Sequence, residues 1–173
     1  MKTIPQIFLF IALSYLTGCN TKIEGFNNKP VGSIEENETS IGILIGVDDD
    51  EVPLSDKEIK SRFTPTVKEA REAERILKNN IREFISTSIY YNETMFTDSL
   101  ENYVRQYAGF INHDNEKEIL INFLWHTSII DLEIEEIWKT RWITVWDGGD
   151  YFWRIRINLN QKKLHSLSVN GVA

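Results

Sequence analysis

The side chains that most often bind metals or act as nucleophiles are few and widely spaced in this sequence. His113, His126 and His165 are far apart, and none belongs to an H-x-x-x-H or H-x-x-E-H pair, which would place two metal ligands on one helix face. Cys19 is the only cysteine, and neither a G-x-S-x-G turn nor a glycine-rich phosphate loop occurs. We therefore predict no metal, no cofactor and no catalytic residue, and hence a protein that is not an enzyme.

Carboxylates are abundant, but their spacing is typical of turns. The Asp147–Asp150 stretch (DGGD) has the composition of a tight turn between strands. The Asp48–Glu51 run lacks the alternating ligand positions and the glycine of an EF-hand loop, so a solvated acidic turn is predicted there. General acid–base chemistry needs a carboxylate held across a cleft. A small-ligand pocket or weak hydrolase between helix and sheet, using His126 or His165, is the alternative function.

Aromatic residues form the most suggestive group, because tryptophan and arginine dominate binding hot spots and aromatic rings stack on sugars. Five tryptophans cluster in and around the predicted strands, and a buried core accounts for Trp125 and Trp153. The remaining candidates share a predicted outer surface that would bind a protein or a glycan. They are Trp142, Trp146, Arg154 and Arg156.

Charge and composition exclude two classes of protein. The 173 residues include 19 Lys and Arg against 26 Asp and Glu, which gives a net charge of −7 and an isoelectric point near 5.0. A nucleic-acid-binding surface needs clustered basic residues, so no nucleic-acid partner is predicted. Hydrophobic residues make up 42% of the chain, which is too many for a disordered protein. The length suits one domain.

A long amphipathic helix is predicted after residue 66. Thr66 and Glu69 form a capping-box pattern, T-x-x-E, at its start. Apolar residues then recur at steps of three and four and so share one face. They are Ala70, Ala73, Leu77, Ile81 and Phe84, while Lys68, Arg71, Glu72, Arg75 and Lys78 fill the other face. We expect a helix of about 20 residues, lying on something apolar through a single stripe.

Beyond the helix, the pattern favours an antiparallel sheet. Thr97–Tyr107 is consistent with a second helical piece or with the start of a strand. From about Ala108 the apolar period is two, and short polar turns separate the successive runs. In the run that begins at Phe152, alternate residues from Trp153 to Leu159 are expected to be buried beneath the helix. The opposite set is expected to be partly exposed to solvent, and it consists of Phe152, Arg154, Arg156 and Asn158.

These elements predict an α+β fold with a long amphipathic helix packed on a four- to five-stranded antiparallel meander sheet. The predicted strands include Trp142–Trp146, which would form a hairpin with the run from Tyr151 through the turn at 147–150. Residues 19–62 are predicted to be a tether and acidic linker. Within them, Ile41–Val47 is either an added edge strand or an apolar stretch of linker. The α+β domain is expected to span residues 63–173.

The amino terminus resembles that of bacterial lipoproteins. Ile4–Leu16 is an uncharged, mostly apolar run, too short to span a bilayer as a helix, which needs about 20 residues. It ends in Leu16-Thr17-Gly18-Cys19, which is similar to the lipobox of that family. In the family the cysteine thiol receives a diacylglycerol thioether, and the chain is cut just before it. An ordinary secretory signal with an incidental cysteine is the alternative.

The lipobox resemblance implies a signal peptide over residues 1–18 and a lipid anchor at Cys19. A sole cysteine can form no intramolecular disulfide, which fits a role as the anchor in an oxidising envelope. Two or three acyl chains hold a protein firmly to a membrane, whereas one does so weakly. Asn20 follows the cysteine in place of the aspartate that retains many such proteins at the inner membrane. We expect attachment to the outer membrane.

The chain from Phe63 onward resembles a group of small lipoproteins common in Bacteroidetes. The resemblance rests on four segments: Phe63–Thr66 (FTPT), Tyr103–Asn112 (YVRQYAGFIN), Ile121–Trp125 (INFLW) and Val169–Ala173 (VNGVA), together with Asp147–Gly149 and Tyr151–Trp153. It implies a cystatin-like arrangement, with one helix cradled by an antiparallel sheet, and no particular activity. Asp98-Ser99-Leu100 also matches the O-glycosylation motif of Bacteroidetes envelope proteins, which makes Ser99 a candidate acceptor; a helix N-cap is the alternative.

Together these observations predict a membrane-anchored envelope lipoprotein with a non-enzymatic domain that binds a protein or a glycan. Protease inhibition follows only by analogy with cystatins. Besides the ligand pocket or hydrolase, a purely structural component of the envelope is the other alternative.

Overall fold

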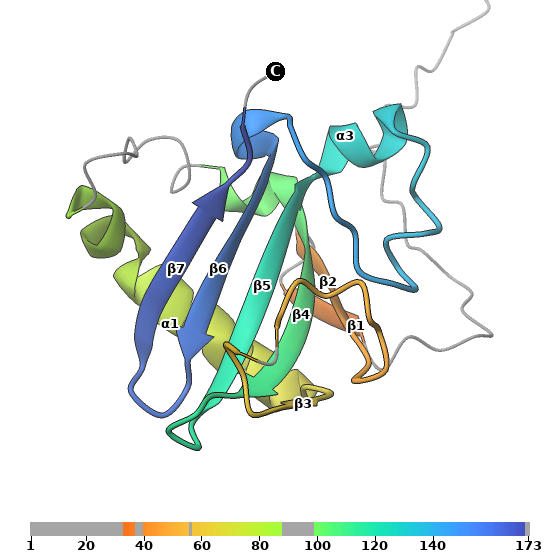
Figure 1. The fold of residues 1–173 in the computed structure, drawn as a ribbon. Helices are drawn as coiled ribbons and strands as arrows, with labels where there is room; N and C mark the ends of the chain where they lie inside the picture. Colours follow the sequence, from red (N-terminus) through yellow and green to blue (C-terminus); the bar gives the residue numbers. More distant parts are fainter. Residues whose placement is uncertain (1–32, 37–39, 56, 88–98, 172–173) are drawn as a thin grey trace, which may run out of the picture.

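The computed structural model describes residues 33–36, 40–55, 57–87 and 99–171 (Figure 1). The predicted signal peptide and Cys19 lie outside the described residues. Within this part of the chain the fold is α+β, with one long helix on a mixed sheet. No helix among these residues has the length and apolar character needed to cross a bilayer.

The sheet has seven strands in the described part of the chain. They are β1 (Ser33–Glu36), β2 (Ser40–Leu44), β3 (Ser61–Phe63), β4 (Tyr103–Ile111), β5 (Lys117–Trp125), β6 (Phe152–Asn158) and β7 (Lys163–Val169). Six follow the order β1-β2-β4-β5-β6-β7, and β3 pairs with β4. The neighbouring pairs from β4 to β7 are antiparallel, as predicted, because short connections join successive strands.

The amino-terminal strands extend the fold beyond the predicted meander. The strand expected at Ile41–Val47 is present as β2, but it is not an edge strand: it pairs with β1 on one side and runs parallel to β4 on the other. β3 pairs antiparallel with the second half of the same β4 edge, from Gly109 to Ile111. The folded body therefore reaches back from the predicted boundary at Phe63 to Ser33, through segments whose polar composition is typical of a linker.

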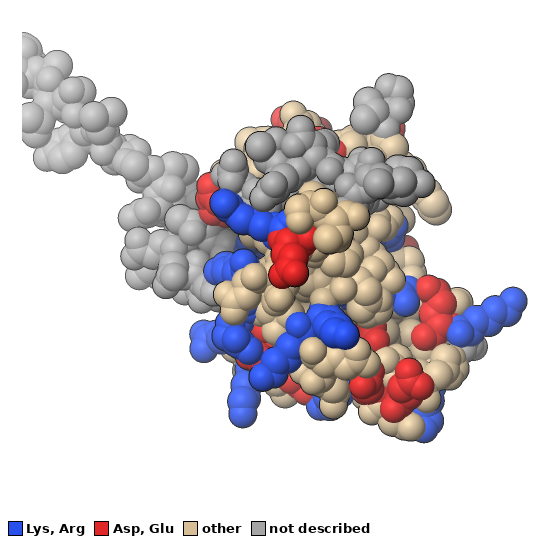
Figure 2. All heavy atoms as spheres, turned by 90° about the vertical axis from the view of Figure 1, so that its left-hand side faces the viewer, with Lys and Arg blue, Asp and Glu red and all other residues tan. Residues whose placement is uncertain are grey.

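Helix α1 (Val67–Ser86) confirms the predicted helix at both its start and its buried face. The Thr66 hydroxyl accepts a hydrogen bond from the Glu69 backbone N–H (3.2 Å), and the Glu69 carboxylate accepts one from the Thr66 N–H (2.9 Å). This capping box satisfies two amide groups that the first turn leaves unpaired. The apolar stripe from Ala70 to Ile81 is buried. Figure 2, which views the side with α1 and β7, shows Lys and Arg gathered there with Asp and Glu among them.

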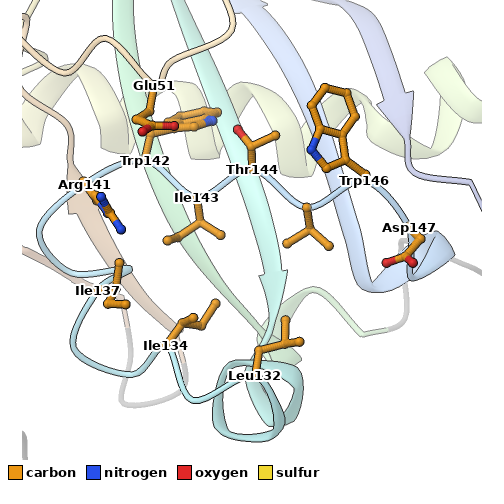
Figure 3. Close-up of a pocket in the computed structure, with 11 residues that line it drawn as sticks. Glu51, Leu132, Ile134, Ile137, Arg141, Trp142, Ile143, Thr144, Trp146 and Asp147 are labelled. Atoms are coloured by element: carbon orange, nitrogen blue, oxygen red, sulfur yellow. The ribbon is translucent and has the colours of Figure 1, made fainter.

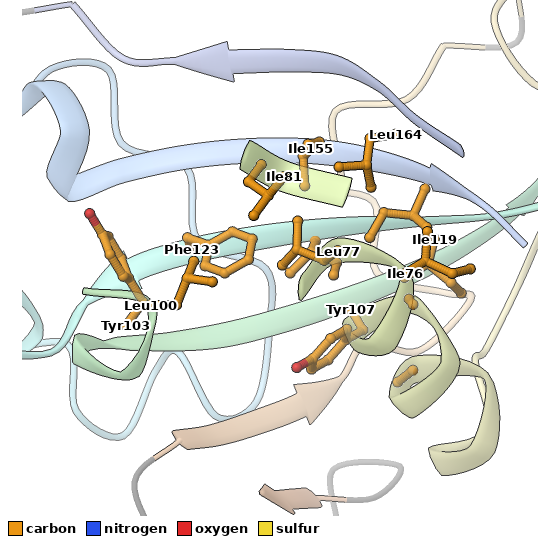
Figure 4. Close-up of a cluster of buried hydrophobic side chains, with 14 of the residues drawn as sticks. Ile76, Leu77, Ile81, Leu100, Tyr103, Tyr107, Ile119, Phe123, Ile155 and Leu164 are labelled. Atoms are coloured by element: carbon orange, nitrogen blue, oxygen red, sulfur yellow. The ribbon is translucent and has the colours of Figure 1, made fainter. Parts of the chain in front are cut away.

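Two hydrophobic cores lie on opposite faces of the sheet. Between α1 and the first face, Leu77 and Ile81 pack among strand residues such as Ile119, Phe123 and Ile155 (Figure 4). The rings of Phe123 and Trp153 are stacked there with centroids 3.6 Å apart. The second core contains Val104, Phe110, Leu120, Leu124 and Phe152 from the strands, with Val52, Ile59, Trp138 and Trp142 from the segments that cover them.

The second core shows that the outer face of β6, expected to be partly exposed to solvent, is instead largely covered. Phe152 and Asn158 are buried, 5% and 4% exposed, whereas Arg154 and Arg156 are half-buried as predicted. The face is covered because residues 45–55, 57–60 and 132–147 fold across it (Figure 1). Alternation along one strand shows only that its two faces differ, so it could not predict this second layer.

The predicted strand at Trp142–Trp146 is wrong. These residues are irregular, and no hairpin forms at Asp147–Asp150. Both edges of β6 are already occupied, by β5 and β7, so no strand position is left for the preceding segment. Instead Gly148 adopts φ +88°, which glycine tolerates, and a 3-10 turn, η2 (Gly149–Tyr151), leads into β6. A further 3-10 turn, η1 (Leu100–Asn102), precedes β4, so Thr97–Tyr107 contains the start of a strand.

Candidate binding groove

A segment of irregular structure, residues 132–147, crosses the second face of the sheet and is called the strap here. It follows the short helix α3 (His126–Asp131), which ends in a Schellman arrangement. There the Ile134 N–H donates to the Ile129 carbonyl and the Glu133 N–H donates to the Ile130 carbonyl, both at 3.0 Å. Glu133 has φ 55°, the left-handed conformation that this arrangement requires at that position. This turn directs the strap back over the sheet.

Two buried amide side chains hold the strap to the sheet. Gln106, on β4, donates through Nε2 to the carbonyls of Trp138 (2.6 Å) and Arg141 (2.7 Å), and its Oε1 accepts the Ile143 N–H (2.9 Å). Asn122, on β5, donates to the Ile143 carbonyl (2.9 Å) and to Gln106 Oε1 (3.0 Å). These bonds take the place of the backbone hydrogen bonds that a neighbouring strand would have made. The buried backbone groups of the strap therefore keep partners.

Two further contacts hold the strap, one within it and one at its end. The Trp142 N–H donates to Asp49 Oδ2 at 2.7 Å, which joins the strap to the loop that begins at Ile45. The Asn170 side chain, just after β7, donates to the carbonyls of Val145 (2.6 Å) and Asp147 (3.1 Å). The strap therefore runs from β4 across β5 and β6 to the end of β7.

A groove of about 520 Å³ opens along the strap (Figure 3). Its apolar lining comes from Leu132, Ile134, Ile137, Ile143 and Val145. In Figure 3 the side chains of Ile134 and Ile143 point toward one another, with Arg141 at one end of the groove and Trp146 with Asp147 at the other. The Trp146 side chain is 89% exposed, Leu132 is 48% exposed and Ile137 is 37% exposed. The Trp146 indole is therefore almost wholly in water, beside other exposed apolar groups. Exposed apolar patches of this kind are typical of interaction sites.

Acidic residues flank this groove on both sides. Exposed Asp131, the last residue of α3, and Glu133, Glu135 and Glu136 of the strap lie among its apolar residues in sequence. From the facing loop Glu51 lines the groove, and exposed Asp48 and Asp50 precede it in sequence. Arg62 fixes that loop: its guanidinium donates to the backbone carbonyls of Asp49 and Gly46. Burial lowers the pKa of Arg62, and the charges of Asp49 and Asp48 oppose this effect. Arg141 is the basic residue of the lining.

The residues predicted for an outer binding surface occupy two places. Trp142 and Trp146 both belong to the strap, but Trp142 is buried in the second core, 1% exposed, so the two do not share one side. Arg154 and Arg156 lie on β6, outside the groove lining. Arg156 is paired with Glu58 at 2.5 Å and lies over the Phe110 ring. Ser99, the predicted glycosylation acceptor, is half-buried just before η1.

The histidines considered for catalysis are dispersed. His126 begins α3 and is exposed. His165 Nε2 lies 2.9 Å from Glu118 Oε2, on the face of the sheet opposite α1. Burial raises the pKa of Glu118, but hydrogen bonds from His165 and Asn112 outweigh it, so the net shift is downward. Among the described residues no group of three or more His, Cys, Asp or Glu is arranged to hold a metal ion.

The residues that build the groove were largely missed from the sequence. Gln106 and Asn122 are polar residues within otherwise apolar strands, and such residues are expected to face solvent. Both are nevertheless buried. The isoleucines of the strap, at positions 134, 137 and 143, follow no single period along its whole length, so no face could be assigned to them. The sequence feature that could have indicated the groove is the mixture of acidic and apolar residues over 131–137, which is typical of a segment exposed to solvent on one side and packed on the other.

Comparisons with known proteins found no match. Neither a protein-family model, nor a curated protein, nor a solved structure is significantly similar to this chain.

Proposed function

We propose that this protein is a lipid-anchored component of the bacterial cell envelope, attached through Cys19 to the outer membrane, and that it acts by binding another protein. The domain would be cystatin-like, a proposal supported by one long helix lying across four successive antiparallel strands. The observation that carries the binding role is the exposed Trp146 indole at the end of an apolar groove.

The groove is suited to an apolar ligand with a specific anchor. Tryptophan is among the residues most often found as interface hot spots, where its truncation costs about 2 kcal/mol or more. The strap that carries Trp146 is fixed by the buried amides of Gln106 and Asn122, so little ordering is needed on binding. Leu132 and Ile137, both exposed on the groove, would be removed from water together with Trp146.

The charges around the groove select the class of partner. Its apolar lining lies between two acidic stretches, 48–51 and 131–136, with Asp147 beside Trp146. Complementary potentials favour a segment in which Lys and Arg alternate with apolar residues and disfavour an acidic one. We therefore propose a cationic amphipathic polypeptide segment as the ligand. Its binding is expected to weaken as salt is raised, because most of these carboxylates are exposed.

The groove is tested with residues 19–173 carrying Cys19→Ser, so that no lipid interferes. The probe is a fluorescein-labelled 18-residue peptide of Lys and Leu in helical spacing, and the measurement is anisotropy. Trp146→Ala is expected to weaken binding about tenfold or more, because a buried indole would lose its contacts. Tyr151→Ala, which removes an exposed ring outside the groove lining, is the matched control and should leave the affinity unchanged.

Two further probes make this test discriminating. A peptide of the same spacing with Glu in place of Lys is expected to bind at least tenfold more weakly. Equal binding of Trp146→Ala and wild type would contradict the groove as the site. Binding of neutral oligosaccharides that depends on Trp146, with none of the Lys–Leu peptide, would replace the proposed protein ligand with a glycan.

The anchor is tested separately in cells. Metabolic labelling with a palmitate analogue is expected to mark the wild-type protein and to be lost in Cys19→Ala, because the thiol is the site of diacylglycerol attachment in lipoproteins. The labelled protein should sediment with outer membranes after fractionation. An unlabelled wild-type protein in the soluble fraction would overturn the proposed location.

A further inference from the structure

The outer face of β6 and β7 carries a cation without a counter-ion. Among the residues that the structure describes, no other element lies over β7 on this face, which is turned toward the viewer in Figure 1. Arg154 stands opposite Asn122 on β5 and Ser168 on β7. Its side chain is half-buried, and within the described part of the chain its guanidinium makes no hydrogen bond and no ion pair.

The neighbouring arginine shows the contrast. Arg156 lies two residues further along the same face and is engaged twice: its Nη2 donates to Glu58 Oε1 at 2.5 Å, and its guanidinium lies over the Phe110 ring. Arg156 therefore adds positive charge near Arg154 but leaves it no anion. The pKa of Arg154 is lowered, first by burial and then by the charge of Arg156.

Two carboxylates on this face of the sheet, Glu58 and Glu118, already have partners. Glu58 accepts hydrogen bonds from Arg156 and from Ser55. Glu118 accepts hydrogen bonds from His165 and Asn112, 2.9 and 2.7 Å away. A half-buried cation beside a second cation is unfavourable without an anion, because it has lost part of its hydration. An incoming oxyanion would restore that interaction.

The local chemistry fits a small oxyanion. A guanidinium presents parallel N–H groups that match two oxygens of a carboxylate or a phosphate. The exposed Ser168 hydroxyl stands across from it and can donate one more hydrogen bond. We propose that Arg154, with Ser168, binds a single oxyanion group, a carboxylate or a phosphate monoester, presented on the open face of β6 and β7. This site is independent of the groove on the strap.

The site is tested by NMR on ¹⁵N-labelled residues 19–173 carrying Cys19→Ser, following arginine Nε–H signals. Inorganic phosphate and acetate are titrated separately, against sodium chloride at equal ionic strength. One arginine signal, absent in Arg154→Gln, is expected to shift saturably with at least one of the two anions. The anion with the higher affinity identifies whether phosphate or carboxylate is the preferred group.

Three variants make the result decisive. Arg154→Gln should abolish the saturable shifts, and Ser168→Ala should weaken binding about threefold to tenfold through loss of one hydrogen bond. Arg71→Gln, an exposed arginine on the outer face of α1, is the matched control and should change nothing. Shifts that stay linear with concentration, or that persist in Arg154→Gln, would overturn the site.

Discussion

Replacing Glu74 with alanine is expected to lower the free energy of unfolding by about 3–5 kcal/mol. Glu74 lies on α1 against the sheet and is 1% exposed. Its Oε1 is 3.2 Å from Arg105 Nε and accepts a hydrogen bond from the Tyr107 hydroxyl at 2.7 Å. Arg105, on β4, is itself 2% exposed. Removing the carboxylate would leave a buried guanidinium without its counter-charge, and that is the costly step.

The remaining contacts of Arg105 would not compensate for this loss. Its Nη2 donates to the Leu100 carbonyl at 2.9 Å, and the guanidinium lies over the Phe123 ring with its carbon 5.3 Å from the centroid. Both are weaker than a close opposite charge in a buried site. Replacing both partners by apolar residues of similar size, Glu74→Leu with Arg105→Met, is therefore expected to recover much of the stability.

Urea unfolding followed by circular dichroism measures these effects, and the helix supplies its own control. Glu72 and Arg75 also form an ion pair, at 2.6 Å, but their side chains are 35% and 53% exposed. Glu72→Ala is expected to change stability by less than about 1 kcal/mol, because water screens the pair. If Glu74→Ala cost no more than Glu72→Ala, the buried pair would not stabilise the contact between α1 and β4.

The comparison of these two glutamates shows what sequence patterns can and cannot predict. The spacing of Ala70, Ala73, Leu77 and Ile81 was sufficient to predict the helix and its buried stripe, because it depends on periodicity alone. Glu74 follows Ala73, at the margin of that stripe, and its burial depends on Arg105, about thirty residues away on a strand. Such a pair is set by tertiary packing, which no local pattern encodes.

The candidate groove was predictable only in part, for a related reason. Trp146 was correctly singled out as a candidate for an exposed surface, but for the wrong reason, since alternation over Trp142–Trp146 indicated a strand. The strand does not form because both neighbouring positions on β6 are taken. The competition between two segments for one sheet edge depends on topology, whereas alternation reports only a preference for extended backbone.

Replacing Gln106 with leucine is expected to destabilise the protein by about 2–4 kcal/mol and to release the strap. Leucine is close in size, so packing is largely kept, but four hydrogen bonds are lost at once. The carbonyls of Trp138 and Arg141, the N–H of Ile143 and the side-chain amide of Asn122 all lose their bonds to Gln106. Each buried polar group left without a partner costs about 1–3 kcal/mol unless it reaches water.

The strap can reach water by detaching, which makes the effect local and measurable. Hydrogen exchange at the Ile143 amide is expected to accelerate strongly in Gln106→Leu, while the α1 amides change much less, because the first core does not involve Gln106. Gln161→Leu is the matched control: its side-chain amide is exposed and, among the described residues, donates only to Glu116, so the Ile143 amide should stay protected.

Release of the strap should also remove the binding activity proposed for the groove. Trp146 and most of the apolar lining belong to the strap, so a detached strap would have to be ordered again on binding. Gln106→Leu is therefore expected to lower the affinity for the Lys–Leu peptide about as much as Trp146→Ala does, although Gln106 does not line the groove. If the variant kept both Ile143 protection and full peptide affinity, the buried amide would not position the groove, and Asn122, Asp49 and Asn170 would be sufficient to hold the strap in place.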